Sequence, residues 1–186
     1  MGTYGYISII AMLCYGFMLL MFLTAKRNKI INSFLVVLTG LLFWTGGSAF
    51  MRAQLWPGCE FWYQVSLLGI LLLPYAYYCF ILAFGGVKKS LPGKIYLAVM
   101  LICFVVNIRH GVFLGCPNVV EKNGLPTFVY EIKPTILVLF FPAGIFLIYL
   151  FLILVRICKA NPNMKVQYEP VMAGVLVLFA GNMLLG

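Results

Sequence analysis

The chain has 186 residues, of which 64% are hydrophobic and 9% charged, and its mean hydropathy is +1.07. This composition excludes a compact soluble globule and predicts an all-α, polytopic integral membrane helix bundle in a lipid bilayer. The formal net charge is +9, but the basic residues are divided among short loops without a continuous stripe, so we expect no binding to nucleic acid.

Six apolar runs predict six transmembrane helices in a single membrane domain, residues 1–186. A hydrocarbon core about 30 Å thick needs about 20 apolar residues in a helix, and each run approaches that length. The first run lacks a preceding basic segment and is too long for a secretory signal. The sixth reaches the last residue without a polar flank, so we expect the sequence to stop before a seventh span. The predicted spans are 4–25, 30–51, 61–84, 95–114, 134–155 and 170–186.

Basic residues gather in the connections after the first, third and fifth runs. The positive-inside rule makes these connections cytoplasmic and places the N-terminus outside. The remaining basic residues are accompanied by acidic ones on the opposite side. The residues that set this orientation are Lys26, Arg27, Lys29, Lys88, Lys89, Lys94, Arg156, Lys159 and Lys165.

The connection 115–133 is a long loop on the predicted outer side. Its segment "VVEKNGLPTFVYEI" has two β-prone stretches around the turn pair Asn123 and Gly124, which predicts a hairpin. Both a lid over the outer mouth of the bundle and a plain connector fit this pattern. Cys59 and Cys116 fall on the same predicted side, where a disulfide could persist, and two free thiols are the alternative.

Prolines and small residues predict local features of the helices. Pro74 and Pro142 fall near the middles of the third and fifth runs and each removes a backbone hydrogen bond, so we expect kinks there. Such a kink is either purely structural or a hinge for signalling. The small residues of "TGGSAF" in the second run should allow another helix to approach closely.

The sequence indicates neither a catalytic site nor a metal site. One histidine and four acidic residues cannot form a multi-histidine metal centre. Zinc-protease, P-loop and dinucleotide-binding motifs are not found in the sequence. We therefore expect a protein that is not an enzyme and needs no cofactor.

Four polar or aromatic residues fall at a similar predicted depth. Trp44, Asn107, His110 and Asn182 would lie roughly 18 to 22 Å from the inner face at about 1.5 Å per residue. They are the candidate pocket for a small-molecule or lipid ligand. The alternative is that Asn107 and Asn182 bond to each other or to a neighbouring backbone, because a buried amide needs partners.

Several segments resemble one known family in their order along the chain. They are "NSFLVVLTGLLFW", "FWYQVSLLGILLLPYAYYCFILAFGG", "NIRHGVFLG" and "FAGNMLLG". The chain is similar to the N-terminal seven-helix region of bacterial sensor histidine kinases, which also occurs ahead of diguanylate cyclase domains. The similarity extends from the first predicted helix to the sixth.

The resemblance implies a sensory or anchoring region of a bacterial signalling protein in the cytoplasmic (inner) membrane. Such a region relays a stimulus through a seventh helix to a cytoplasmic kinase of a two-component system, usually as a homodimer. We expect the chain to depart from the family pattern by stopping before that helix and by lacking an output domain. A diguanylate cyclase output, a small transporter or channel, and an anchor that senses nothing are the alternatives.

Overall fold

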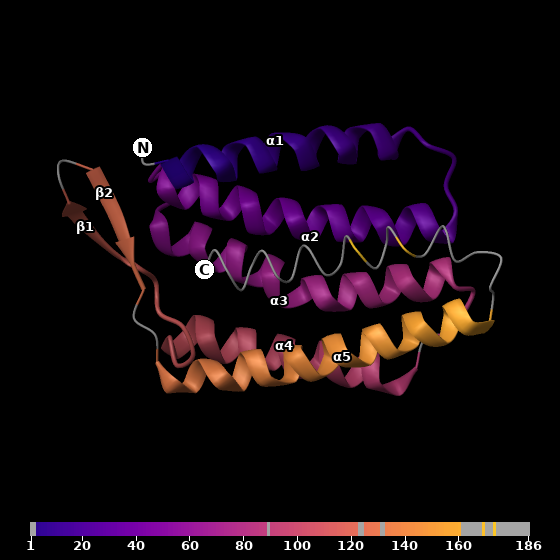
Figure 1. Ribbon diagram of the computed structural model, residues 1–186. Coiled ribbons are helices and arrows are strands. Elements are labelled where there is room, and N and C mark those ends of the chain that lie inside the picture. The colour runs from indigo at the N-terminus through magenta and orange to yellow at the C-terminus, as the bar shows by residue number, and fades with distance from the viewer. Residues whose placement is uncertain are drawn as a thin grey trace. The chain divides into compact units, whose positions relative to one another are not determined.

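The computed structural model describes residues 3–88, 90–122, 125–130 and 133–160, together with 169 and 173. Within these residues, five helices are long and apolar enough to cross a membrane, which confirms a helical membrane domain. The sixth predicted span, 170–186, lies outside the described residues apart from 173. The helices are α1 (Thr3–Leu23), α2 (Lys29–Arg52), α3 (Cys59–Phe84), α4 (Leu91–His110) and α5 (Leu137–Ala160), which a 3-10 turn, η1 (Pro134–Ile136), precedes (Figure 1).

The chain divides into two compact units, Met1–Gly144 and Ile145–Gly186. The first unit holds α1 to α4, a β-hairpin and the beginning of α5, and the second holds the rest of α5. All the geometry that follows belongs to the first unit.

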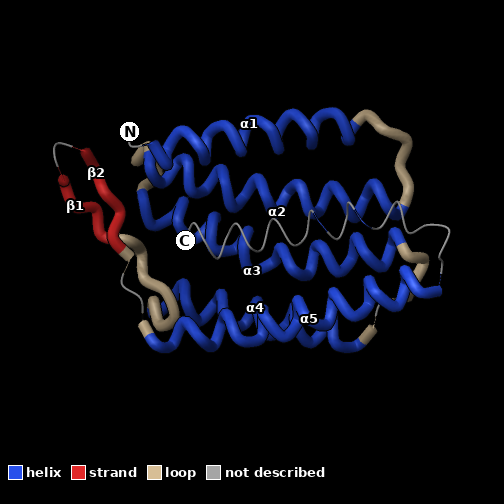
Figure 2. Tube along the Cα trace, in the orientation of Figure 1, coloured by secondary structure: helices blue, strands red, loops and turns tan. Residues whose placement is uncertain are grey.

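Helices α1 to α4 alternate in direction, so their connections gather at two ends. The connections 24–28 and 85–90 lie at one end, and the connection 53–58 lies at the other with the hairpin (Figure 2). We call the latter the hairpin end. Asn28 starts α2 at the opposite end because its side-chain oxygen accepts a hydrogen bond from the Ile31 N–H, at 2.7 Å.

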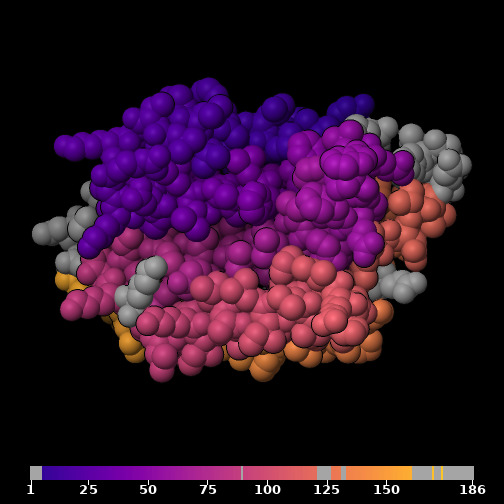
Figure 3. Space-filling view, turned by 180° about the vertical axis from the view of Figure 1, so that it is seen from behind, coloured from indigo at the N-terminus to yellow at the C-terminus, as the bar shows by residue number. Residues whose placement is uncertain are grey.

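The tightest packing is between α2 and α3, where glycines let the backbones approach. A methyl group added at Gly47 would lie 2.6 Å from the Ser66 nitrogen, and one added at Gly69 would lie 2.5 Å from the Trp44 nitrogen. The Ser66 hydroxyl also donates to the Trp44 carbonyl oxygen at 3.0 Å. The close approach predicted from "TGGSAF" is therefore confirmed. In the space-filling view from behind, the indigo-to-magenta atoms of the first unit lie against one another (Figure 3).

Both prolines lie within continuous helices. Pro74 is buried inside α3, and Pro142 lies inside α5 five residues after Leu137, where that helix begins. Each helix continues on both sides of its proline. A role as a signalling hinge stays a prediction.

The fourth helix differs from its predicted span. We expected residues 95–114, whereas α4 begins at Leu91 and ends at His110. Hydropathy located the apolar run, but capping residues set its ends. Ser90 is the N-cap and Pro92 is tolerated in the first turn, while Gly111 adopts the left-handed conformation, with φ of 55°, that ends many helices.

The predicted hairpin is confirmed. Strands β1 (Asn118–Lys122) and β2 (Leu125–Val129) pair antiparallel, with Val120 opposite Thr127. They flank Asn123 and Gly124, which lie outside the described residues. The Phe128 ring connects the hairpin to the end of α2, because the Arg52 guanidinium carbon lies 5.7 Å from the ring centroid.

Candidate functional site

Asn107 holds the segment that follows α4, residues 111–117, which we call the return loop. The Asn107 side chain is only 1% exposed. Its Oδ1 accepts hydrogen bonds from the N–H groups of Phe113 and Leu114, each at 3.0 Å, and its Nδ2 donates to the Leu114 carbonyl at 3.0 Å. A buried amide is costly without partners, and here both of its ends have them. Bonding to a neighbouring backbone was one of the arrangements expected for this residue.

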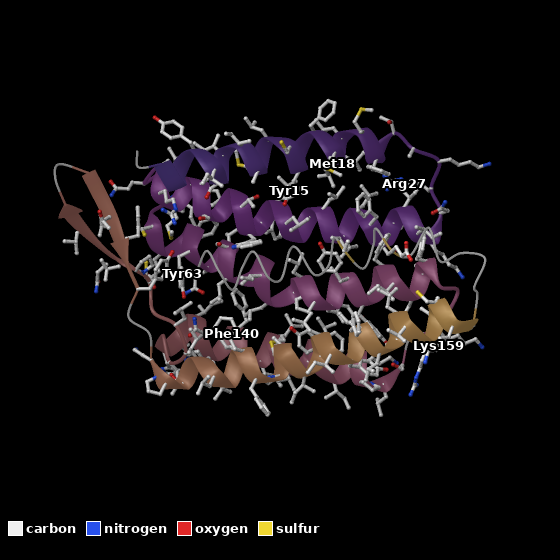
Figure 4. All side chains as sticks on the ribbon, viewed as in Figure 1. Tyr15, Met18, Arg27, Tyr63, Phe140 and Lys159 are labelled. Atoms are coloured by element: carbon white, nitrogen blue, oxygen red, sulfur yellow. The ribbon has the colours of Figure 1, made fainter. Side chains whose placement is uncertain are left out.

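Tyr63 ties the same loop to α3. Its hydroxyl donates to the Leu114 carbonyl oxygen at 3.0 Å, and its side chain is 4% exposed. Figure 4 shows Tyr63 near the hairpin end of α3, whereas Arg27 lies at the opposite end. The Leu114 carbonyl therefore accepts from two helices, through Tyr63 of α3 and Asn107 of α4.

The residues just before α5 also bond to the return loop. The Thr135 hydroxyl donates to the Val112 carbonyl at 2.5 Å, and the Lys133 ammonium donates to the Gly111 carbonyl at 3.0 Å. Together with Asn107 and Tyr63, these bonds make the return loop the junction of α3, α4 and the start of α5. A displacement of the loop would therefore act on three helices at once.

Two thiols meet beside this junction. The sulfurs of Cys59, the first residue of α3, and Cys116 of the return loop lie 3.6 Å apart, and both thiols are free. Desolvation raises the pKa of Cys116 to about 12, helped by the hydrogen bond with Cys59 and by electrostatic repulsion from Cys59 and Glu60. Cys116 consequently stays protonated at neutral pH. The structure thus brings together the pair that the sequence placed on one side.

Tyr130, which follows the hairpin, is influenced by the charges of Cys59, Cys116 and Arg52. Desolvation raises the pKa of Tyr130, and the charges of Cys59 and Cys116 raise it further, whereas the positive charge of Arg52 lowers it. The phenol therefore stays neutral near physiological pH. Arg52 thus contacts the Phe128 ring of the hairpin and lowers the pKa of Tyr130, the residue after it.

A groove of about 740 Å³ lies between the first turns of α3 and the last turns of α4. Gln64 contributes an amide whose oxygen is buried and accepts no hydrogen bond within the described residues. The lining combines apolar side chains with a few polar groups, and consists of Pro57, Gly58, Cys59, Glu60, Phe61, Gln64, Val65, Leu68, Phe104 and Ile108.

Sequence reasoning missed this groove because most of its lining residues are ordinary apolar residues of a membrane helix. One signal was available. Glu60 and Gln64 are one helical turn apart in an otherwise apolar stretch, so both polar groups point from the same face of α3. That spacing indicates a face of α3 that is not simply in contact with lipid tails.

The four residues proposed from the sequence lie in different surroundings. Trp44 is partly buried in α2, Asn107 is bonded to the return loop, and His110 is exposed at the last residue of α4. Asn182 lies outside the described residues. The first three do not line the groove. The early end of α4 explains the difference for Asn107, because it puts this residue one turn from the helix end, where it caps instead of facing a cavity.

The chain matches a known protein family over most of its length. Residues 7–185 match the family described as the N-terminal 7TM region of histidine kinase. No curated protein and no solved structure matches the chain. The matched residues include nearly all of α1 and the whole of α2 to α5, the hairpin and the return loop.

Proposed function

This chain belongs to the family of N-terminal 7TM regions of histidine kinases, and we propose that it receives a stimulus at the hairpin end and relays it to a cytoplasmic histidine kinase. Regions of this family are non-catalytic input domains with a sensory role in membrane signal transduction. The family therefore supports reception and relay as the role of these residues. A diguanylate cyclase in place of the kinase would leave the same input mechanism intact.

The observation that carries the proposal is the shared carbonyl of Leu114. Tyr63 and Asn107 both donate to it, and the residues before α5 bond to the same loop. Packed helices respond to a local change by switching between discrete arrangements and do not deform continuously. A stimulus that moves the return loop would change the relative populations of two such arrangements. The shift would reach the output through the helices that the loop joins.

The hairpin end is extracytoplasmic in this proposal. The support is the distribution of charge, because Lys26, Arg27 and Lys88 belong to the connections at the opposite end. The N-terminus is then outside as well, and the chain lies in a bacterial inner membrane. A stimulus from outside the cell would meet the hairpin and the return loop first.

The stimulus in this proposal is a small molecule or a lipid that contacts the hairpin end. His110 is exposed beside the return loop and would contact it, whereas Asn107 would act by holding the loop. Trp44 and Asn182 stay predicted members of this site from their depth in the sequence. Signalling proteins of this kind generally act as homodimers, so we place dimerisation in the parent protein.

The test uses the full-length protein in membrane vesicles and measures its autophosphorylation. His110→Ala and Asn182→Ala should change the rate by about fivefold or more, the lower limit of ordinary coupling between sites, with unchanged amounts of protein in the membrane. Arg109→Ala, the exposed neighbour of His110, is the matched control. Wild-type rates in both variants would overturn the proposed site. If the output is a cyclase, cyclic dinucleotide formation replaces phosphorylation as the readout.

A further inference from the structure

We propose that Cys59 and Cys116 form a reversible disulfide that fastens the return loop to the beginning of α3. The site is a covalent modification site whose partner is an exposed disulfide of a thiol–disulfide exchange protein. The proposal rests on the extracytoplasmic position of the hairpin end, which belongs to the proposed function. It adds a chemical input to the junction of α3, α4 and α5.

The geometry favours this pair. A disulfide bond is about 2.05 Å long, and the two sulfurs already lie 3.6 Å apart. Cys59 is fixed as the first residue of α3, and Cys116 follows Leu114 by two residues, where Asn107 and Tyr63 hold the backbone. The thiols are therefore brought together by the bonds of the loop and need only a small approach. The other cysteines, Cys14, Cys79, Cys103 and Cys158, lie within helices.

A partner protein can also reach the two cysteines. Cys116 is exposed, and Cys59 is partly exposed and lines the groove. In bacteria the extracytoplasmic space is kept oxidising by dithiol–disulfide exchange proteins, and the cytoplasm is not. A pair at the hairpin end would thus encounter the required oxidant.

The reaction balances through two exchange steps. The Cys59 thiolate, after losing its proton to solvent, attacks the partner's disulfide, and one partner sulfur leaves as a thiolate that takes up a proton. Cys116 then loses its proton and attacks the Cys59 sulfur of the mixed disulfide, which releases the second partner sulfur. Two electrons and two protons pass in total from the Cys59 and Cys116 thiols to the partner, which ends as a dithiol. A reduced dithiol reverses the sequence.

The electrostatics agree with this order of attack. The raised pKa of Cys116 makes it a poor first nucleophile at neutral pH. Once Cys59 is in the mixed disulfide, its thiol hydrogen bond and its negative charge no longer raise the pKa of Cys116. Cys116 is thereby released to attack in the second step.

Oxidation would change how firmly the junction is held. In the reduced form the return loop is held by hydrogen bonds to Asn107 and Tyr63 and by those from Lys133 and Thr135. In the oxidised form a covalent bond to α3 is added. The return loop would then move less when a stimulus arrives. The redox state of the two cysteines would therefore determine how strongly the region responds to the stimulus.

The experiment treats membranes containing the full-length protein with oxidised dithiothreitol as the probe. Free thiols are blocked with N-ethylmaleimide, the sample is reduced, and new thiols are labelled with a polyethylene glycol maleimide. The wild type should gain two labels, and a cross-linked Cys59–Cys116 peptide should appear by mass spectrometry. Cys59→Ser and Cys116→Ser should gain none, and Cys14→Ser, the matched control, should still gain two. A wild type that gains none, or whose two labels lie elsewhere, would overturn the proposal.

A second measurement separates this proposal from the orientation on which it rests. A membrane-impermeant maleimide is applied to intact cells after mild reduction. Labelling of Cys116 supports the extracytoplasmic hairpin end. Labelling only after the cells are opened would contradict the orientation and with it the oxidant named here. If the disulfide nevertheless forms with oxidised dithiothreitol, the pairing of Cys59 with Cys116 is supported, but an extracytoplasmic exchange protein as the oxidant is excluded.

Discussion

Asn107 and Leu114 exchange hydrogen bonds in both directions, since Asn107 Oδ1 accepts from the Leu114 N–H and Nδ2 donates to the Leu114 carbonyl, each at 3.0 Å. The side chain of Asn107 thus replaces the helical partners that the chain loses when α4 ends at His110. One buried amide fixes the direction in which the chain leaves the helix. The stability of the hairpin end should therefore depend on this residue.

Asn107→Ala should destabilise the protein. It leaves the N–H groups of Phe113 and Leu114 without their acceptor, and each buried unsatisfied group costs about 1–3 kcal/mol. The measurement is thermal unfolding in detergent, and the melting temperature should fall. Asn32→Ala replaces an exposed asparagine of α2 and is the matched control. Equal melting temperatures for the two variants would show that the amide does not hold the loop.

Tyr63→Phe should have a smaller effect than Asn107→Ala. The Leu114 carbonyl loses the tyrosine hydroxyl but keeps the Asn107 amide, so the expected loss is about 0.5–1.5 kcal/mol. Because the two donors share one acceptor, their effects should not add. Unfolding of the two single variants and the double variant measures this coupling. Simple additivity would mean that the two bonds are independent.

Gly69→Ala should separate α2 from α3. The added methyl would meet the Trp44 backbone nitrogen at 2.5 Å, and overpacking of this kind costs about 1–3 kcal/mol. Gly144→Ala is the control, because a methyl there meets no atom within 4 Å among the described residues and should stabilise its helix by about 0.5–1 kcal/mol. Melting temperatures should move in opposite directions. A tolerated Gly69→Ala would contradict the close approach of the two backbones.

Ile108→Trp should fill the groove between α3 and α4. The measurement is the rate at which a maleimide with an alkyl chain labels Cys59, which lines the groove, in a Cys116→Ser background. The rate should fall because the larger side chain occupies the space that the alkyl chain would enter. Ile102→Trp, on an exposed face of α4, should leave it unchanged. Equal rates would show that apolar molecules do not reach Cys59 through the groove.

The labelling of Cys116 should depend on pH and on Cys59. Only the thiolate reacts, and because the pKa is raised to about 12, the labelling rate of the reduced protein should still be rising at about pH 10. Cys59→Ala removes a hydrogen bond and a negative charge that both raise this pKa. The pKa should then fall, and labelling near neutral pH should become faster. Slower or unchanged labelling, measured by peptide mass spectrometry, would contradict the assigned causes.

Much of the fold could be predicted because it follows from hydropathy and local turn chemistry. The apolar runs located the helices, and the pair Asn123 and Gly124 indicated a hairpin before its strands were known. The end of α4 could not be obtained in this way, since "GVFL" is apolar enough to continue the helix. The left-handed backbone of Gly111 stops it instead.

The end of α4 at His110 determines the surroundings of Asn107. With Leu114 counted as part of the helix, the predicted partner of Asn107 is either Asn182 or a neighbouring backbone, and its predicted depth groups it with His110. In the structure the chain turns back and gives Asn107 its partners from the return loop. Topology placed Cys59 and Cys116 on one side, but their distance depends on the same turn. Long-range contacts that rest on a loop conformation are not encoded in periodicity.

The most direct test of the relay is the autophosphorylation of the full-length Asn107→Ala protein in membrane vesicles. This variant loosens the return loop without touching the opposite end of the bundle. We predict a rate that differs from the wild type by about fivefold or more, while Asn32→Ala behaves as the wild type. An Asn107→Ala protein with a lowered melting temperature and a wild-type phosphorylation rate would show that the return loop moves without consequence for the output, and would contradict the proposed relay.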